Sequence, residues 1–476
     1  MLPRKKTKIV ATLGPACSTK EIIKQMIESG VNVFRINFSH ADYFDIEDKV
    51  KIIRELNAEF NYNTSILADL QGPKLRVGVM KNEVVLKKGD IITFSTKEEF
   101  LGTAEKVYMT YKSFPQDVNP GETILLDDGK LIFTVLDTDG EHEVRAMVVQ
   151  GGPLKSKKGV NLPNTKVSLP ALTEKDIKDA IFAVKLSVDW IALSFVRTPE
   201  DLEDLRLLIE EHGDHKIPII AKIEKPEAVA NINKIVSHCD GLMVARGDLG
   251  VEIPAQEVPL IQKQLVHKAK YARIPVIIAT QMMETMITSL TPTRAEVNDV
   301  ANSVMDGADA VMLSGETSVG NYPVQVIEKM TQIINSVENS DLIKLPVNDP
   351  KIKTKRFITK SICYHAADMA NDIEAKVINT LTNSGYTAFQ ISAWRPNAHI
   401  LAYTSNKHML TQLSLLWGVT AFWYDKYEST DVTIEDINQI AKENNYVQPG
   451  DYTINLASMP LIEKGMVNTI RISEIE

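Results

Sequence analysis

Short apolar runs alternate with segments of helical periodicity through most of the chain. Eight runs rich in β-branched residues have apolar N-terminal portions that are continuous rather than alternating, at residues 8–14, 31–38, 64–70, 190–196, 217–224, 241–248, 274–281 and 308–316. Continuous apolar strands are typical of parallel sheets covered on both faces, and helices between them favour a β/α order. Eight such units predict an α/β protein built on a closed (β/α)8 TIM barrel.

Helix boundaries are marked between these strands. Residues 18–21 (Ser-Thr-Lys-Glu) predict a capping box at the start of a helix that Gly30 ends. Thr198 and Pro199 open a second helix, and Gly213 ends it. The helical segments therefore have the lengths that β/α units require.

The β/α rhythm stops twice, which divides the chain into three domains. After Pro73, short alternating strands and glycine turns predict an inserted all-β domain, and Pro346 to Pro350 predicts a linker to a final α/β domain. In that final domain we expect a strand near residues 375–382 and a helix that opens at Thr387. The predicted boundaries are 1–73 with 170–345 for the barrel, 74–169 for an inserted β-barrel lid, and 346–476 for a C-terminal α/β regulatory domain.

Composition narrows the possible partners. The 476 residues carry a formal net charge of −9, which argues against general nucleic-acid binding, and no apolar run approaches the roughly 18 residues of a membrane span. The basic N-terminus runs into a strand without an apolar signal region, and the three cysteines match no disulfide or zinc spacing. We therefore expect a cytoplasmic protein that binds neither nucleic acid nor membranes.

Nearly every predicted barrel strand becomes polar at its C-terminal end. In a TIM barrel these ends converge on one mouth, where active sites lie. One such residue is unremarkable on a surface loop, but polar ends on seven strands predict a functional site. The residues are Arg35, Asn37, Ser39, Asp69, Ser194, Arg197, Lys222, Glu224, Arg246, Asp248, Thr280, Gln281, Ser314 and Glu316.

Lys222 and Glu224 are two residues apart on one predicted strand, so both side chains leave the same face. Asp248 adds a second carboxylate at the matching height of the next strand. Carboxylates without nearby His or Cys suit Mg²⁺ or Mn²⁺, and the alternative is a structural salt bridge, Lys222 with Glu224 or Arg246 with Asp248.

Three further residues at this mouth suit an anionic substrate. Gly247 lets backbone N–H groups approach a ligand, and a helix turn that starts there would favour an anion such as a carboxylate. Arg35 offers a planar fork for a phosphate, together with Lys222. Thr280 supplies a hydroxyl, although a packing threonine is an equally good interpretation of that residue alone.

Motifs along essentially the whole chain resemble those of the pyruvate kinase family, in the family's order. The most specific are residues 221–224 (Ala-Lys-Ile-Glu) and 244–250 (Val-Ala-Arg-Gly-Asp-Leu-Gly). The others are 12–15 (Thr-Leu-Gly-Pro), 35–40 (Arg-Ile-Asn-Phe-Ser-His), 68–73, 157–163, 280–284, 292–296 and 312–317. The resemblance implies Mg²⁺-dependent phosphoryl transfer from phosphoenolpyruvate to ADP, giving pyruvate and ATP in the last step of glycolysis.

The resemblance also implies roles for individual residues. Glu224 and Asp248 would bind Mg²⁺ or Mn²⁺, and Arg35 and Lys222 would hold and neutralise the phosphoryl group. Thr280 with the amides of Gly247 and Asp248 would bind the substrate carboxylate, and Thr280, Ser314 and Glu316 would belong to the region that protonates the enolate. ADP would be bound by Thr12, Pro15, Asn37, His40, Arg76 and Lys158, where His40 taken alone is equally a core histidine.

One departure from the family pattern concerns potassium. Members that need K⁺ resemble one another in an Asp-Thr-Lys-Gly-Pro-Glu run, whereas residues 69–74 here read Asp-Leu-Gln-Gly-Pro-Lys. A Lys74 ammonium near Asp69 would replace the monovalent cation electrostatically, in a site formed by Asn37, Ser39, Asp69, Leu70 and Lys74. We therefore predict that K⁺ is not required; the alternative is that Lys74 is a solvated hinge residue.

The predicted C-terminal domain carries a polar turn that resembles the family's sugar-phosphate effector pocket. Its matching residues are Thr382, Ser384, Gly385 and Thr387. A turn before a helix can bind a phosphate, but a simple helix cap explains Ser384 and Thr387 as well. We expect a phosphorylated allosteric effector of unspecified identity, and the family resemblance implies a homotetramer.

Two other functions fit parts of this pattern. A pyruvate-type aldolase or lyase would use the same metal and enolate chemistry, but it needs neither the inserted domain nor the turn at residues 12–15. A non-catalytic sensor or scaffold would be expected to lose the charged residues at the mouth, and these are present. Phosphoryl transfer is the interpretation that uses all of the motifs.

Overall fold

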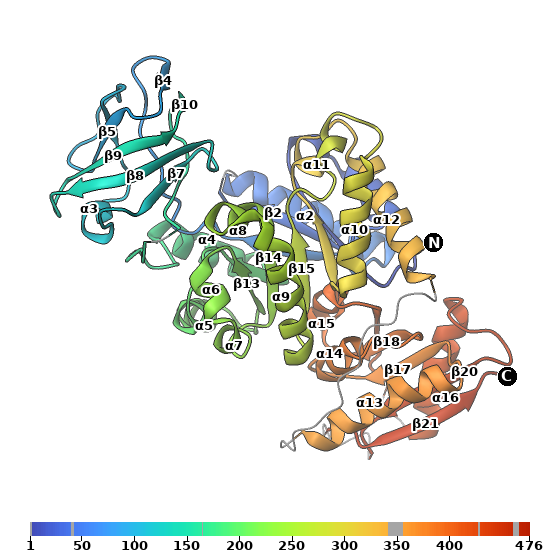
Figure 1. Cartoon of the computed structure of the whole chain (residues 1–476). Helices are drawn as coiled ribbons and strands as arrows, with labels where there is room; N and C mark the ends of the chain where they lie inside the picture. The colour runs from blue at the N-terminus through green and yellow to red at the C-terminus, as the bar shows by residue number, and fades with distance from the viewer. Residues whose placement is uncertain (1, 40–41, 164, 341–355, 427–428, 460–465) are drawn as a thin grey trace.

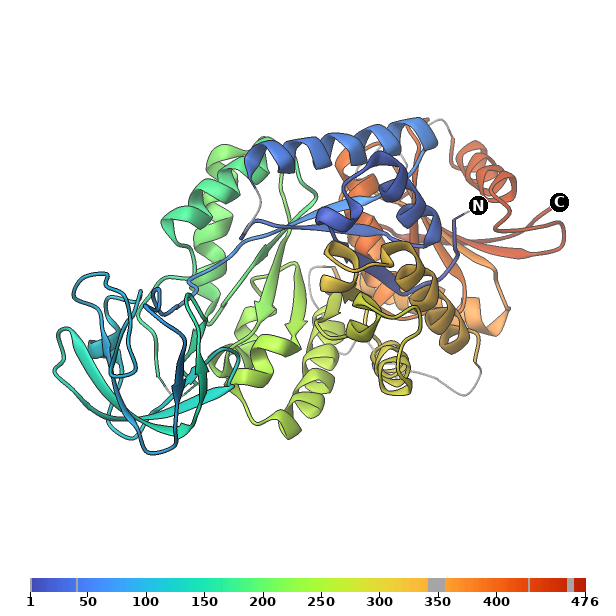
Figure 2. The same ribbon diagram turned by 90° about the horizontal axis from the view of Figure 1, so that it is seen from above.

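The structure is a computed structural model that describes residues 2–39, 42–163, 165–340, 356–426, 429–459 and 466–476. A barrel occupies the centre of the molecule, with an all-β unit at one end and an α/β unit at the other (Figure 1). The view turned by 90° keeps these two units at opposite ends (Figure 2). The barrel therefore separates the inserted unit from the C-terminal unit.

Eight parallel strands close into a barrel in the order β1, β16, β15, β14, β13, β12, β3, β2, which confirms the predicted fold class. Each predicted run contains one strand, but each strand ends one to three residues earlier than predicted, because the last residues of each run belong to the following loop or helix. The strands are β1 Lys8–Thr12, β2 Val33–Asn37, β3 Ser65–Asp69, β12 Trp190–Leu193, β13 Ile219–Ile223, β14 Gly241–Ala245, β15 Val276–Ala279 and β16 Ala310–Leu313.

Helices surround the barrel (Figure 1). Thr198 and Gly213 cap α5 as predicted, but the capping box at residues 18–21 is wrong. Thr19 caps α1, because its backbone is extended whereas Ser18 has the αR conformation that ends the preceding 3-10 turn. The helices are α1 Lys20–Ser29, α2 Tyr43–Phe60, α4 Glu174–Lys185, α5 Pro199–His212, α6 Pro226–Ala230, α7 Ile232–Ile235, α8 Arg246–Glu252, α9 Val258–Ala272, α10 Arg294–Asp306, α11 Gly315–Ser318 and α12 Pro323–Glu338.

The inserted unit consists of two small sheets. One pairs β10 with β4, and the other has the order β11, β7, β8, β9, β5, β6 and is antiparallel except between β5 and β6. Buried aromatic residues such as Phe94 and Phe133 form its own core. Its elements are β4 Val84–Leu86, β5 Ile91–Ser95, β6 Lys106–Tyr108, α3 Phe114–Asp117, β7 Thr123–Leu126, β8 Leu131–Thr138, β9 Glu143–Gln150, β10 Gly152–Leu154 and β11 Val160–Asn161.

The C-terminal unit is a five-stranded sheet with the order β19, β18, β17, β20, β21 and flanking helices. The strand predicted at 375–382 and the helix predicted at Thr387 are present as β17 and α14. The elements are α13 Phe357–Asp372, β17 Val377–Leu381, α14 Tyr386–Ala393, β18 His399–Thr404, α15 Lys407–Gln412, β19 Val419–Trp423, α16 Thr430–Glu443, β20 Tyr452–Ala457 and β21 Thr469–Glu474. The predicted linker at residues 346–350 lies outside the described residues, and the domain boundaries stay predictions.

The C-terminal unit covers the N-terminal end of the barrel. Leu415 joins the apolar cluster that fills the barrel interior, and Trp190 at the start of β12 donates from Nε1 to the Gln412 carbonyl at 3.2 Å. This contact leaves the carboxyl ends of the strands facing the inserted unit. Over the ranges that the structure describes, none of the helices combines the length and apolar content of a membrane span.

Candidate active site

Lys222 is the centre of a buried ionic cluster at the carboxyl ends of neighbouring strands. Its Nζ lies 3.0 Å from Glu224 Oε1 and 3.1 Å from Asp69 Oδ1, and it donates to Ser194 Oγ at 2.7 Å. The side chains of Asp69 and Glu224 are only 1% and 2% exposed. The Lys222–Glu224 salt bridge considered from the sequence is therefore present, as one part of a larger cluster.

Arg35 joins this cluster through Asp69. Its Nε donates to Asp69 Oδ2 at 2.6 Å, and its guanidinium also donates to Thr12 Oγ1 at 3.0 Å. The Thr12 hydroxyl in turn donates to the Leu313 carbonyl at 2.9 Å. Thr12, which was predicted to contact the nucleotide, orients Arg35 in this structure.

Burial and neighbouring charges shift the pKa values in this cluster. Burial alone would raise the pKa of Asp69, but Lys222 and Arg35 outweigh it and lower that pKa. Burial alone would lower the pKa of Lys222, but Asp69 and Glu224 outweigh it and raise that pKa. Lys222 is therefore a permanent cation, and Asp69 a permanent anion, at neutral pH.

The two predicted metal ligands come from neighbouring strands. Glu224 follows β13, which pairs with β14, and Asp248 lies in the first turn of α8 directly after β14. Burial and then the charge of Asp248 raise the pKa of Glu224, against the opposing effect of Lys222. A divalent cation would relieve this repulsion between two oxygen donors, so the residues fit Mg²⁺ or Mn²⁺.

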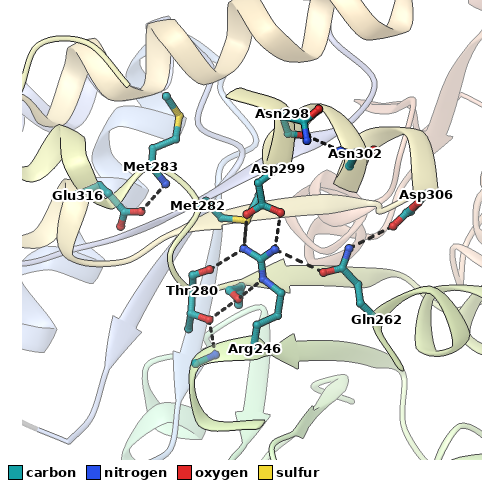
Figure 3. Close-up of polar contacts among 12 residues, drawn as sticks. Arg246, Gln262, Thr280, Met282, Met283, Asn298, Asp299, Asn302, Asp306 and Glu316 are labelled. Atoms are coloured by element: carbon teal, nitrogen blue, oxygen red, sulfur yellow. Dashed lines mark hydrogen bonds and ion pairs between the residues drawn. The ribbon is translucent and has the colours of Figure 1, made fainter. Parts of the chain in front are cut away.

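The alternative Arg246–Asp248 salt bridge is wrong. Arg246 forms a bidentate pair with Asp299 on α10 at 2.6 and 2.7 Å, and it also donates to the Thr280 carbonyl at 2.8 Å (Figure 3). Gln262 on α9 accepts from the same guanidinium at 3.5 Å. Asp299 and Gln262 were missed in the sequence because no local pattern relates them to Arg246.

Thr280 and Gln281 have an unfavourable backbone conformation beside this network. Their φ values are 74° and 53°, in the left-handed region that side chains, and β-branched ones above all, rarely adopt. Thr280 Oγ1 accepts from the Gly247 N–H at 2.7 Å and donates to the Ala279 carbonyl at 2.5 Å. The Gly247 amide predicted to meet a substrate carboxylate is therefore bound to Thr280.

Glu316 holds two mouth loops together. Its carboxylate accepts from the Met283 N–H at 3.1 Å (Figure 3) and from the Ser314 N–H at 2.7 Å, and the residue is 2% exposed. Ser314 precedes α11, and Met283 follows β15. The predicted proton-relay residues Ser314 and Glu316 are thus neighbours, with Glu316 bound to backbone rather than aimed into the mouth.

The residues predicted to bind the nucleotide lie on the barrel and on the inserted unit. Asn37 Oδ1 accepts from the Ser39 N–H at 3.1 Å, and Pro15 begins a 3-10 turn; His40 lies outside the described residues. On the inserted unit Arg76 forms a β-bridge with Gly159, and Lys158 Nζ lies 2.9 Å from Asp127 Oδ1. The structure therefore places these residues on two separate bodies.

An open pocket of about 630 Å³ lies beside the Asn37–Ser39 loop and was not identified from the sequence. Lys175 connects the two, because its Nζ donates to the Phe38 carbonyl at 2.8 Å. The charged residues at the start of α4 could have indicated this pocket, but charged residues are also common at the ends of ordinary helices. The pocket is lined by Asp42, Tyr43, Thr173, Glu174, Lys175, Lys178 and Asp179.

The potential monovalent-cation residues are only partly together. Asn37 and Asp69 pair at the ends of the adjacent strands β2 and β3, Ser39 lies two residues beyond Asn37, and the Leu70 carbonyl accepts from Ser194 Oγ at 2.6 Å. Lys74 is exposed. The cations paired with Asp69 are Arg35 and Lys222.

The predicted effector turn leads from β17 into α14. Gly385 is the N-cap of α14 with a φ of 75°, and no side chain caps this described helix start. The Thr387 hydroxyl is buried and accepts from Thr380 at 2.9 Å, whereas Ser384 is exposed. The Thr382 N–H donates to the Tyr403 carbonyl at 2.9 Å, and the residue is half-buried, so Ser384 is the more exposed of the two hydroxyl residues on this side of the turn.

Comparisons with known proteins agree with this geometry. The family description "Pyruvate kinase, barrel domain" matches residues 4–327, and "Pyruvate kinase, alpha/beta domain" matches residues 360–473. The pyruvate kinase of Corynebacterium efficiens is 42% identical over 98% of this chain and 97% of its own length, and that of Clostridium perfringens is 40% identical over 99% and 100%. A crystal structure of a pyruvate kinase from Cryptosporidium parvum superposes with a TM-score of 0.92 at 34% identity, covering 99% of this chain and 97% of that one. This chain belongs to the pyruvate kinase family.

Proposed function

We propose that the barrel mouth transfers the phosphoryl group of phosphoenolpyruvate to ADP, and that Arg35, Lys222, Glu224, Asp248 and Thr280 perform this reaction. The observation that carries the proposal is the buried cluster in which Lys222 lies within 3.1 Å of both Asp69 and Glu224. As a member of the family the chain is a phosphotransferase that forms pyruvate and ATP.

Glu224 and Asp248 would hold the Mg²⁺ or Mn²⁺ ion that pyruvate kinases use. The ion supplies positive charge to the substrate oxygens and to the phosphoryl group in transit. The raised pKa of Glu224, which burial and the Asp248 charge cause, supports this role. Loss of either carboxylate is expected to weaken metal binding without unfolding the barrel.

Lys222 and Arg35 would receive the phosphoryl group. Arg35 is oriented by Asp69 and Thr12, so its guanidinium is held before substrate binds. Lys222 stays protonated because Asp69 and Glu224 raise its pKa, which lets it neutralise charge throughout the transfer. Both cations lie against buried carboxylates, and this environment strengthens their electrostatic effect.

Thr280 and the start of α8 would bind the substrate carboxylate. The Gly247 N–H and the Thr280 hydroxyl already face one another at 2.7 Å, and a carboxylate would replace this contact with two of its own. Thr280 and Ser314 would then protonate the enolate. Glu316 would act through Ser314, because its carboxylate binds the Ser314 backbone N–H.

The nucleotide would lie between the barrel and the inserted unit. Pro15, Asn37, His40 and the pocket at Lys175 would contact ADP from the barrel, with Arg76 and Lys158 approaching from the inserted unit as it closes. Thr12 would contribute through Arg35.

We further propose that turnover needs no potassium. Lys74 sits on the segment that enters the inserted unit, so closure of that unit would bring its ammonium toward Asn37, Ser39 and Asp69. The alternative is that Lys74 is a solvated hinge residue, as its exposure allows. A phosphorylated effector at the turn of Ser384, a homotetramer and a cytoplasmic location remain proposals that rest on the family and on composition.

A coupled assay for pyruvate tests the proposed reaction. Pyruvate should form from phosphoenolpyruvate only when ADP and Mg²⁺ are both present, with one ATP for each pyruvate. Pyruvate formed without ADP, with release of inorganic phosphate, would show that water is the acceptor and that the protein is a hydrolase, and no pyruvate under any condition would support a scaffold. Either result would refute the proposal.

A further inference from the structure

Glu252 connects three segments around the mouth and has no role in the chemistry above. It is the last residue of α8, the helix that begins with Gly247 and Asp248, and it is 5% exposed. A carboxylate at a helix C-terminus is unfavourable for the helix dipole, and a buried charge must be paired. Its presence therefore requires a partner.

Lys225 is the charged partner of Glu252. Its Nζ donates to Glu252 Oε1 at 2.6 Å, and both side chains are about one tenth exposed or less, at 11% and 1%. Lys225 directly follows Glu224. The pair therefore ties the end of the helix that carries Asp248 to the segment that carries Glu224.

The inserted unit contributes the third segment through Asn161. Its Nδ2 donates to the same oxygen, Glu252 Oε1, at 2.8 Å. Asn161 belongs to β11, which pairs with β7 in the six-stranded sheet, where Asn161 lies opposite Leu125. Asn161 therefore links this sheet to Glu252.

The arrangement is not the one that stability alone would favour. One oxygen of Glu252 accepts both bonds, while Oε2 is buried without a hydrogen-bond partner among the described residues. A buried acceptor without a partner destabilises the folded state, because it has lost its hydrogen bonds to water. A simple apolar contact at this place would avoid that cost, which favours a functional reason for the carboxylate.

Other contacts hold the connecting segments but not the sheet itself. Arg197 donates to the Val167 and Leu169 carbonyls at 2.5 Å each, and Asp176 accepts from the Gly72 N–H at 3.0 Å. These bonds fix where the chain leaves and re-enters the barrel. Asn161, by contrast, belongs to the inserted sheet itself.

We propose that Glu252 is a positioning residue that couples the orientation of the inserted unit, through Asn161, to the metal-binding segments, through Lys225. The inference rests on the proposed reaction and metal ligands. Its consequence is that nucleotide alignment and metal binding depend on two different hydrogen bonds to one carboxylate. The bond from Asn161 affects nucleotide alignment, and the bond from Lys225 affects metal binding.

Two substitutions distinguish the effects of these two hydrogen bonds. Asn161→Leu removes the donor to Glu252 and keeps the Lys225 pair, so KM for ADP should rise and kcat should fall, each by about tenfold, as for loss of one hydrogen bond to a charged group. KM for phosphoenolpyruvate and the Mg²⁺ concentration for half-maximal activity should stay within about twofold of wild type. Glu252→Gln removes the charge that pairs with Lys225, so it should also raise that Mg²⁺ concentration by about tenfold.

Asn119→Leu is the matched control. Asn119 Nδ2 donates to Glu122 Oε1 at 3.0 Å, which is the same kind of bond, but both partners lie within the inserted unit. Electron-resonance distances between spin labels at Lys97→Cys and Glu210→Cys report the orientation of the unit directly. Both positions are exposed, and the three native cysteines are buried.

The distance distribution should broaden in Asn161→Leu and Glu252→Gln and stay unchanged in Asn119→Leu. The proposal is overturned if Asn161→Leu matches Asn119→Leu in both distances and KM for ADP. It is also overturned if kcat/KM for both substrates and the unfolding temperature fall together, because that pattern indicates a purely structural role. If Asn161→Leu does not fold, Glu252→Gln decides alone: unchanged distances and Mg²⁺ dependence refute the coupling. Absence of activity in the wild-type protein would instead refute the proposed function.

Discussion

Asp299 offers the sharpest test of how the substrate-binding loop is held. Asp299→Asn keeps the size of the side chain but removes the charge that pairs with Arg246 at 2.6 and 2.7 Å. Arg246 binds the Thr280 carbonyl, so this pair supports the backbone of Thr280 and Gln281 in its left-handed conformation. Asp299 lies outside the mouth chemistry, so its effect must pass through Arg246.

The expected effect follows from two magnitudes. A hydrogen bond to a charged group contributes about 1.5–3 kcal/mol, and a strained backbone residue costs about 1–3 kcal/mol. Because the two are of similar size, a loss of about 2 kcal/mol is enough to let the loop relax. That loss corresponds to a population change of about thirtyfold. KM for phosphoenolpyruvate should therefore rise by up to about thirtyfold, whereas KM for ADP should change by less than about threefold.

Steady-state kinetics with each substrate varied in turn measures this difference. Asp240→Asn is the control, since Asp240 pairs with Arg206 and Lys216 and contacts neither Arg246 nor the partners of Arg246. An Asp299→Asn enzyme with the phosphoenolpyruvate KM of the control would refute the reasoning. An equal rise in KM for both substrates would also refute it, because it would indicate general unfolding.

Three further predictions concern charge and pH. Glu316→Gln should lower the free energy of unfolding, measured by urea titration, by about 1–3 kcal/mol, because one of the two backbone N–H groups loses its acceptor. An unchanged urea midpoint together with a lower kcat would instead indicate that Glu316 is a direct proton donor. Burial and then the charges of Lys6 and Arg4 lower the pKa of His399 to about 4. The unfolded chain therefore binds more protons between pH 6.5 and 4, and the free energy of unfolding should fall by up to about 3 kcal/mol as pH falls through this range. Urea titrations of His399→Gln should lack this component, and a pH profile identical to that of wild type would contradict the prediction. Turnover with all potassium replaced by tetramethylammonium should remain near its full rate, and a collapse that potassium restores would show that Lys74 does not substitute for the ion.

The barrel was predictable because its strands are buried on both faces and therefore appear as continuous apolar runs. The prediction of where each strand ends was less accurate. Lys222 is the fourth residue of β13, whereas Glu224 and Asp248 already lie in the following loop and helix. Polar residues at a barrel mouth belong to both kinds of segment, so polarity alone does not mark where a strand stops.

The partners of the predicted site residues were harder to identify. Ser194 was recognised as a polar strand end, but its bond to Lys222 depends on the stagger of two neighbouring strands. Asp299 and Glu252 lie on helices, where an acidic residue usually faces solvent. Only the packing of those helices against the mouth distinguishes them from ordinary surface carboxylates.

Turnover of Lys222→Met tests most directly whether this lysine neutralises the phosphoryl group in transit, next to the metal held by Glu224 and Asp248. Pyruvate formation and Mn²⁺ binding by electron resonance are measured on the same preparation. We predict that kcat falls by about a thousandfold or more, as when one charge-stabilising cation is removed from a phosphoryl-transfer site, while the two carboxylates still bind Mn²⁺. Turnover within about tenfold of wild type, in protein that still binds Mn²⁺, would contradict the account.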